Sequence, residues 1–321
     1  MKRYLDDLPP TMSAELRDDV CVAFLNRPEK RNAVDLSIIH GLKLLFAHLD
    51  GSPVKGLVIA GRGDHFCAGL DLNELREYDA EEGMRHSLSH HEAFRAIQYA
   101  PVPVVCVLHG ATIGAGLEIA SAAHLRVAER SAYYGLPEGQ RGIFLGGGGS
   151  VRISRLVGLS RVVDMMMTGR TYTAEEGYQF GFSQYLVEPG EGLARAIEVA
   201  RRAAANSSLS NFAMIQALPR IVEMGPDEGL FTEALMTGVA QSSRDAKKRL
   251  ADFLEKRASK VLLPLPVPEP MPELAGAAAA RERATVEGPS PNGGTSVDPG
   301  TDSAARHTPN GSRPGEPRPA D

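Results

Sequence analysis

The sequence lacks any apolar run approaching the roughly 18 residues that a membrane-spanning helix needs, so no membrane segment is expected. The first residues, Met1 to Met12, include two basic residues but no apolar segment typical of a secretion signal. An excess of positive charge is also missing, because the formal net charge is -5 and the pI is near 6.0. That balance gives no general affinity for nucleic acid or anionic lipid. We expect a cytoplasmic protein that binds neither a nucleic acid nor a membrane.

Cysteine is scarce, with three residues in a chain of 321. The three are odd in number and widely spaced, and Cys21 and Cys106 lie in apolar, strand-like segments. This pattern indicates reduced core residues of a cytosolic protein and excludes a disulfide framework. The length allows one large domain or two small ones, and either can bury a substantial core.

The most informative segment runs from Val104 to Glu118. An apolar run over residues 104–108 predicts a buried strand, a glycine-rich turn follows, and residues 117–125 predict a helix. Backbone N–H groups at a helix start have no intrahelical partner and carry the positive end of the helix dipole. Small residues there, including Ala115, let a ligand oxygen approach the main chain. Glu118 follows about one helical turn later, so its carboxylate can face the same ligand.

A second donor of this kind is predicted after the strand expected over residues 54–60. Gly69 permits a tight turn, and the amide of Leu70 is then free to point into a cavity, because a helix is expected to begin at Asp71. Farther along, Pro137 stiffens the turn that presents Glu138. If Glu118 and Glu138 share one cavity, burial and like charge keep one protonated while the other is ionised. Spacing alone does not show that they converge, and two unrelated surface glutamates are the simpler interpretation.

A metal site and a nucleotide cofactor are both weighed and set aside. Residues 74–100 predict a polar helix on which His86 and His90 share a face, as in some zinc sites. No third ligand has evident spacing, so we interpret this as an exposed or rim helix and assign no metal. The segment Gly114 to Gly116 resembles half of a dinucleotide-binding fingerprint, but Ile119 occupies its third glycine position. No cofactor is therefore expected.

Five motifs occur in order along the chain: LNRPEKRNAV, FCAGLDL, HGATIGAGLE, YGLPEG with GGGGSVRISRLVG, and SSRDAKKRLADFLEKR. Together they resemble the crotonase (enoyl-CoA hydratase/isomerase) family from about Leu16 to Lys260. The resemblance implies an α/β fold, a spiral of repeated strand-strand-helix units with a helical C-terminal trimerisation region. It implies an acyl-CoA substrate and a homotrimer or dimer of trimers. The implied reaction is reversible syn addition of water to a 2-enoyl-CoA, with coenzyme A entering only as part of the substrate.

The resemblance also assigns residues to roles. It places Leu70 and Ala115 as the backbone N–H donors of an oxyanion hole and Glu118 and Glu138 as the catalytic carboxylates. The residues expected at the CoA site are Lys30, Arg31, Ala33, Ala68, Leu70 and Asp71.

Some departures from the family pattern leave the acyl class open. Leu145 stands where relatives carry a proline, and Ala115 where they carry a glycine. Arg141 follows the second glutamate, and either a polar acyl group or a structural ion pair accounts for it. Isomerisation, hydration coupled to carbon–carbon cleavage, and thioester hydrolysis are alternative reactions. A non-catalytic relative that binds acyl-CoA or RNA is a further alternative, although residues 35–50 contain only one lysine or arginine, Lys43.

Composition divides the chain into three regions. We predict a core with the CoA-thioester site over residues 14–190 and a helical oligomerisation region over residues 191–261. Residues 262–321 are rich in Pro, Gly, Ser and Ala. Such a segment cannot bury enough apolar surface to offset its ordering entropy, so a disordered tail is expected.

Overall fold

The structure is a computed structural model that describes residues 5–75 and 78–257 of the chain. The chain divides into two units, Met1–Ser259 and Lys260–Asp321, and the described residues all lie in the first. The tail predicted over residues 262–321 therefore lies outside the described residues. The predicted boundary between residues 190 and 191 stays a prediction.

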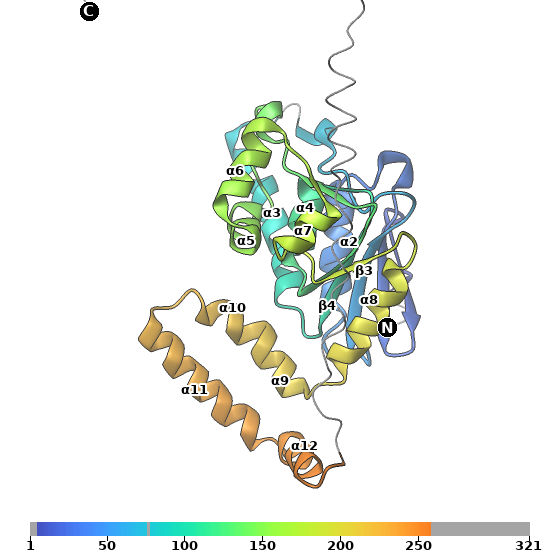
Figure 1. Ribbon diagram of the computed structural model, residues 1–321. Coiled ribbons are helices and arrows are strands. Elements are labelled where there is room, and N and C mark those ends of the chain that lie inside the picture. Colours follow the sequence, from blue (N-terminus) through green and yellow to red (C-terminus); the bar gives the residue numbers. More distant parts are fainter. Residues whose placement is uncertain (1–4, 76–77, 258–321) are drawn as a thin grey trace, which may run out of the picture. The chain divides into compact units, whose positions relative to one another are not determined.

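In the described part of the chain, six strands form one sheet in the order β1-β2-β3-β4-β6-β9 (Figure 1). The first two strands pair antiparallel, and every later pair of neighbours is parallel. Parallel strands covered on both faces are apolar throughout, which explains the continuous apolar runs in the sequence. The strands are β1 (Met12–Arg17), β2 (Val20–Leu25), β3 (Gly56–Gly61), β4 (Val104–Leu108), β6 (Leu125–Glu129) and β9 (Tyr185–Val187).

Helices cover both faces of this sheet. Helix α8 (Gly192–Ala204) packs on one face, and α2 (Leu36–Ala47), α3 (Ala80–Gln98) and α4 (Ala115–Ala122) pack on the other. Successive side chains of a strand point to opposite faces, so β2 contributes alternate residues to the two cores. The α8 side receives Val20, Val22 and Phe24, and the opposite side receives Cys21, Ala23 and Leu25.

A second, smaller sheet consists of β5 (Ala111–Ile113), β7 (Tyr133–Gly135) and β8 (Tyr172–Thr173). The order strand, strand, helix therefore recurs along the chain, first as β1, β2 and α2 and then as β4, β5 and α4. Strands β6 and β7 followed by α5 (Gly149–Val157) make the third repeat. This confirms the predicted α/β class and its repeated units.

Local signals set several element boundaries. The Asp35 side chain accepts a hydrogen bond from the Ile38 N–H at the start of α2. Thr173 opens α7 (Ala174–Gln179) with a capping box. The helix predicted from residue 71 is only the 3-10 turn η2 (Leu72–Leu75), and α3 begins later, at Ala80.

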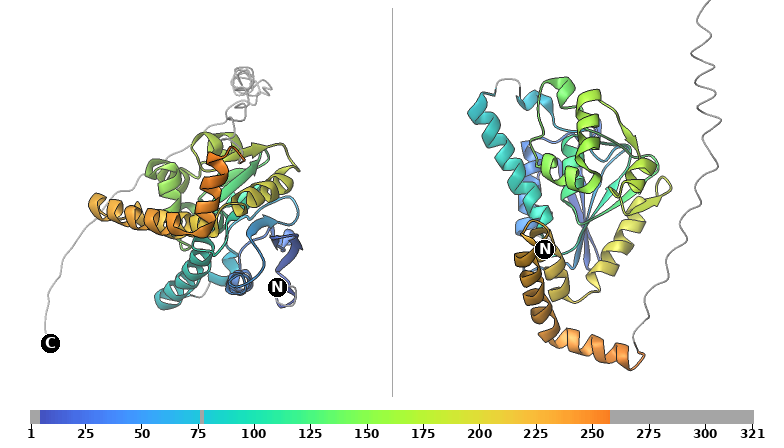
Figure 2. Two further views of the ribbon diagram at one scale, coloured as in Figure 1. Left: turned by 90° about the horizontal axis from the view of Figure 1, so that it is seen from below. Right: turned by 60° about the vertical axis from the view of Figure 1, so that its left-hand side comes forward.

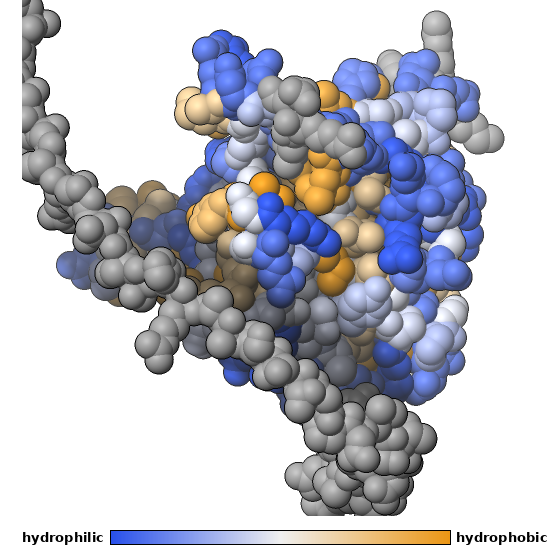
Figure 3. Space-filling view, turned by 90° about the horizontal axis from the view of Figure 1, so that it is seen from above, coloured by the Kyte–Doolittle hydropathy of each residue, from blue (hydrophilic) through white to orange (hydrophobic). Residues whose placement is uncertain are grey.

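The C-terminal part of the described chain is helical, as predicted. It contains α9 (Ser208–Phe212), α10 (Leu218–Ile221), α11 (Pro226–Ser242) and α12 (Arg244–Leu254). Helices α11 and α12 extend beyond the sheet and the helices that cover it (Figures 1 and 2). They expose large apolar side chains, namely Leu230, Phe231, Leu235, Val239, Leu250, Phe253 and Leu254. On the face shown in Figure 3, by contrast, apolar patches lie among hydrophilic residues.

Candidate active site

The segments that follow β3 and β4 meet at the carboxyl end of the sheet, where open α/β sheets bind ligands. The loop after β3 is fixed to β5 by backbone hydrogen bonds, from the Cys67 N–H to the Ala111 carbonyl and from the Ile113 N–H to the Cys67 carbonyl. Gly116, in the first turn of α4, lies so close that an added Cβ would be 2.5 Å from the Cys67 carbonyl oxygen. This contact explains why a small residue is needed here.

Several backbone N–H groups in these segments have no acceptor among the described residues, and those of Leu70 and Ala115 belong to residues that line one cavity. Close to Leu70, the Ala68 N–H donates to the Arg31 carbonyl and the Asp71 N–H to the Val34 carbonyl. Neither the Leu70 N–H nor the Ala115 N–H has a partner in the described chain. Ala115 is the first residue of α4, so its amide also carries the positive end of the helix dipole.

Glu118 lies one turn into α4 and is 4% exposed. Its Oε1 accepts hydrogen bonds from the backbone N–H groups of Gly147 at 2.8 Å and Gly149 at 2.9 Å. Burial raises the pKa of Glu118, while the Gly149 and Gly147 N–H groups oppose that rise by stabilising the carboxylate. An added Cβ at Gly147 would be 2.7 Å from Glu118 Oε2. The glycine run therefore surrounds this carboxylate closely and binds it through backbone N–H groups.

Glu138 follows β7 and is 7% exposed. Its Oε2 is buried without a hydrogen-bond partner, whereas Oε1 of Glu118 accepts two hydrogen bonds. Burial raises the pKa of Glu138 to about 7, the charge of Glu118 acts in the same direction, and the charge of Arg141 opposes it. Two backbone N–H groups thus favour the ionised form of Glu118, and Glu138 Oε2 has no such donor, so Glu138 is the better placed of the two to keep a proton near neutral pH.

One cavity of about 260 Å³ brings the predicted residues together. Both glutamates and both residues with unpartnered amides line it. The glycine segment at residues 146–147 and two histidines of α3 complete the wall near them. The full lining is Leu70, Gly83, His86, Ser87, His90, Ala115, Glu118, Glu138, Ile143, Phe144, Leu145, Gly146 and Gly147.

Replacing Glu138 by glutamine is expected to raise the free energy of unfolding by about 3 kcal/mol at about pH 8 and to change it little near pH 4. The folded-state pKa of about 7 exceeds the ordinary value of 4.5, so the wild type loses stability as the pH rises between these values. Glutamine does not titrate, so the variant does not lose stability in this pH range. Urea unfolding of both proteins at the two pH values measures the difference. An equal stability difference at both pH values would contradict the raised pKa.

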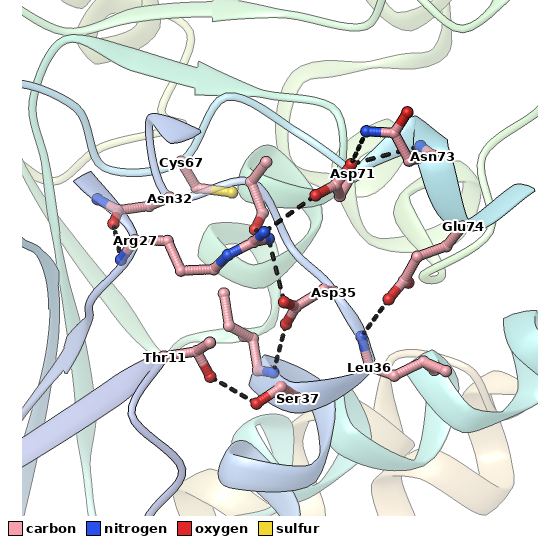
Figure 4. Close-up of polar contacts among 12 residues, drawn as sticks. Thr11, Arg27, Asn32, Asp35, Leu36, Ser37, Cys67, Asp71, Asn73 and Glu74 are labelled. Carbon is pink, nitrogen blue, oxygen red and sulfur yellow. Dashed lines mark hydrogen bonds and ion pairs between the residues drawn. The ribbon is translucent and has the colours of Figure 1, made fainter. Parts of the chain in front are cut away.

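The motif after β2 forms a partly buried polar network (Figure 4). The Arg27 guanidinium bridges two carboxylates, at 3.2 Å from Asp35 Oδ2 and 3.0 Å from Asp71 Oδ2. It also donates to the Ala33 carbonyl at 2.7 Å. The hydrogen bond from Arg27 lowers the pKa of Asp71. Sequence reasoning missed this role of Arg27, which holds the segments before α2 and after Gly69 together.

The residues predicted to bind CoA lie near this network. Lys30 and Arg31 are exposed, and Ala33 and Ala68 are half-buried. Among the six predicted positions, only Leu70 lines the cavity of the glutamates. The CoA assignments therefore stay predictions.

The interpretation of Arg141 as a structural ion-pair partner is wrong. Its side chain is exposed, forms no ion pair with the described residues and does not line the cavity. It lies at the end of the 3-10 turn η3 (Gly139–Arg141). The polar-acyl interpretation of Arg141 has no support from the cavity lining either.

The helix that carries His86 and His90 is largely exposed, as predicted, but His90 itself is buried, and both histidines line the cavity. Their spacing of four residues was the available signal. Within the described residues no group of three or more His, Cys, Asp or Glu side chains is placed to hold a metal ion. No helix in this part of the chain has the length and apolarity to cross a membrane.

Comparison with known proteins agrees with this geometry. A family model described as Enoyl-CoA hydratase/isomerase matches residues 15–261. The short-chain-enoyl-CoA hydratase of Clostridium acetobutylicum is 30% identical over 76% of this chain and 94% of its own. The crotonyl-CoA hydratase of Syntrophomonas wolfei is 28% identical over 77% of this chain and 96% of its own. A solved structure of a candidate enoyl-CoA hydratase from Rhodopseudomonas palustris is 52% identical, with a TM-score of 0.74 over 77% of this chain and 95% of that one. These matches confirm the predicted fold, and the chain belongs to the enoyl-CoA hydratase/isomerase family.

Proposed function

We propose that this protein is an enoyl-CoA hydratase, which adds water reversibly and in the syn sense to the double bond of a 2-enoyl-CoA. The observation that carries the proposal is the shared cavity, in which two buried carboxylates lie with two unpartnered backbone amides. A hydratase needs a base for water, an acid for carbon and donors for the thioester oxygen.

The amides of Leu70 and Ala115 polarise the substrate. The thioester oxygen accepts hydrogen bonds from both N–H groups, which stabilises the negative charge that develops when water attacks the β-carbon. Preorganised donors of this kind contribute several kcal/mol to catalysis, because they need no reorientation during the reaction. Ala115 adds the dipole of α4 to the effect.

The two glutamates move the protons. Glu118, held ionised by the Gly147 and Gly149 N–H groups, takes a proton from water as the water oxygen bonds to the β-carbon. Glu138, with its pKa of about 7, gives its proton to the α-carbon. Glu118 ends protonated and Glu138 ionised, and exchange of one proton between the site and solvent restores the starting state. The reaction needs no cofactor besides the CoA of the substrate.

The CoA part of the substrate is assigned to the segments that flank the Arg27 network. Lys30 and Arg31 present positive charge at the surface, which suits phosphate groups. Ala33, Ala68 and Asp71 contribute the backbone that leads from this surface to Leu70.

Product analysis tests the reaction type. Wild-type protein is incubated with crotonyl-CoA and with branched and aromatic enoyl-CoAs, and the products are identified by mass spectrometry. Hydration adds one water to the thioester, isomerisation leaves the mass unchanged, cleavage shortens the acyl chain and hydrolysis releases free CoA. A product other than the hydrated thioester would move the function to another reaction of this family.

We also propose that the protein assembles as a homotrimer or a dimer of trimers. The large apolar side chains exposed along α11 and α12 support association, because monomers rarely expose a contiguous apolar surface of this kind. Sedimentation equilibrium of the full chain measures the assembly, and a stable monomer would overturn the proposal.

A further inference from the structure

Two histidines of α3 form part of the cavity wall without having a role in the proposed hydration. His86 and His90 are one helical turn apart, and their ring centroids lie 4.3 Å from each other. His90 is 3% exposed, and the side chain of His86 is 9% exposed. Neither Nε2 atom has a hydrogen-bond partner among the described residues. Buried polar atoms are normally paired, so an orphaned pair beside a cavity indicates a ligand group.

The geometry at His90 fixes the hydrogen-bonding role of its free nitrogen. Nδ1 lies 2.9 Å from the His86 carbonyl oxygen, which only accepts, so Nδ1 carries the hydrogen. Burial lowers the pKa of His90 to about 4, which keeps the ring neutral near pH 7. Nε2 is therefore a bare acceptor, and its ligand must supply a hydrogen-bond donor.

His86 has a different neighbour. Its Nε2 lies 3.7 Å from Glu74 Oε2, which also lacks a hydrogen-bond partner. The other oxygen of Glu74 accepts from the Leu36 N–H at 3.0 Å. A carboxylate beside an imidazole nitrogen favours the tautomer with hydrogen on that nitrogen, and that hydrogen is then directed at the carboxylate. The Nε2 of His90 is therefore the nitrogen of the pair that is left for a ligand.

The histidines belong to the same wall as the catalytic base. His90 contacts Phe94 edge to face at 5.8 Å between centroids, and Phe94 packs against Gly147, which binds Glu118. Apolar side chains, among them Ile143 and Leu145, line other parts of the cavity. Apart from the histidine pair, its polar side chains are Ser87 and the two glutamates assigned to catalysis.

We propose that His86 and His90 form a subsite for a hydroxyl group carried by the acyl chain of the substrate, a specificity that rests on the proposed CoA-thioester function. A hydroxyl group donates its hydrogen to His90 Nε2. A carboxylate lacks the hydrogen that His90 requires, and an unsubstituted chain leaves the His90 nitrogen unpaired, at a cost in binding.

Calorimetric titration with saturated acyl-CoAs tests this subsite, since these ligands cannot be hydrated. Two matched pairs serve as probes: para-hydroxyphenylpropanoyl-CoA against phenylpropanoyl-CoA, and omega-hydroxyhexanoyl-CoA against hexanoyl-CoA. In at least one pair, the wild type is expected to bind the hydroxylated ligand about tenfold more tightly. His90→Leu brings that ratio close to one, and His90→Gln, which keeps an acceptor, restores part of it.

His91→Leu is the matched control, because His91 is the next residue on α3 but is exposed and does not line the cavity. It should keep the wild-type preference. Equal affinities within both pairs for the wild type, or an unchanged preference in His90→Leu, would overturn the proposal. A clear hydroxyl preference without turnover of the corresponding enoyl-CoAs would support the subsite and overturn the hydratase proposal alone.

Discussion

Replacing Glu118 by glutamine is expected to lower kcat for hydration by about 10²-fold or more, the usual contribution of a general base. Glutamine is close in shape to glutamate, and its side-chain oxygen can still accept from the Gly147 and Gly149 N–H groups. The variant therefore keeps these hydrogen bonds but cannot take a proton from water. Loss of enoyl-thioester absorbance measures the rate.

Two further measurements distinguish a loss of catalysis from a loss of folding or of substrate binding. The Glu118→Gln variant should unfold at the same denaturant concentration as the wild type or a higher one, since it removes a buried charge. Its affinity for a saturated acyl-CoA should also remain near that of the wild type. If the variant turned over enoyl-CoA at the wild-type rate, Glu118 would have no part in the mechanism. If the variant lost its activity because it is unfolded, the result would show only that Glu118 has a structural role.

The second large effect is expected at Gly147, where alanine should lower kcat by about 10²-fold. The added Cβ would be 2.4 Å from Phe94 Cε2 and 2.7 Å from Glu118 Oε2. Both distances are too short for non-bonded atoms, so the carboxylate must move. A displacement of about 1 Å of a catalytic group costs rates of this order.

Gly146→Ala provides the matched control for Gly147→Ala. At Gly146 the nearest atom to an added Cβ is Ser87 Oγ at 3.8 Å, which is an ordinary contact. The two variants share the same loop, the same change and the same cost in backbone entropy. Equal rates in both would show that the glycine run does not position Glu118.

Much of the fold followed from local sequence signals. The apolar run of β4 and the glycine turn after it were predicted, and so was a helix over residues 117–125, although α4 spans Ala115–Ala122 and Leu125 already begins β6. The intervening strand β5 was missed, because Ala111–Ile113 is too short to show a periodicity. The 3-10 turn at Leu72–Leu75 was predicted as an ordinary helix start because both begin with the same turn.

Local sequence signals could not predict that the two glutamates share one cavity. Glu118 and Glu138 reach one cavity because β5 and β7 pair in parallel, with Ile113 opposite Gly135, and a single sequence does not reveal that pairing. The prediction that the two glutamates act together came from the family resemblance. His86 and His90 show the same limit, since helical spacing gives a shared face but not what that face meets.

The most direct test of the account is the turnover of Glu138→Gln with the best enoyl-CoA of the product analysis, measured as loss of enoyl-thioester absorbance beside the wild type. Glu138 is the buried carboxyl group whose pKa of about 7 makes it the acid for the α-carbon. The account predicts a fall in kcat of about 10²-fold or more while saturated acyl-CoA still binds. Wild-type turnover in this variant would contradict the pairing of two glutamates as acid and base.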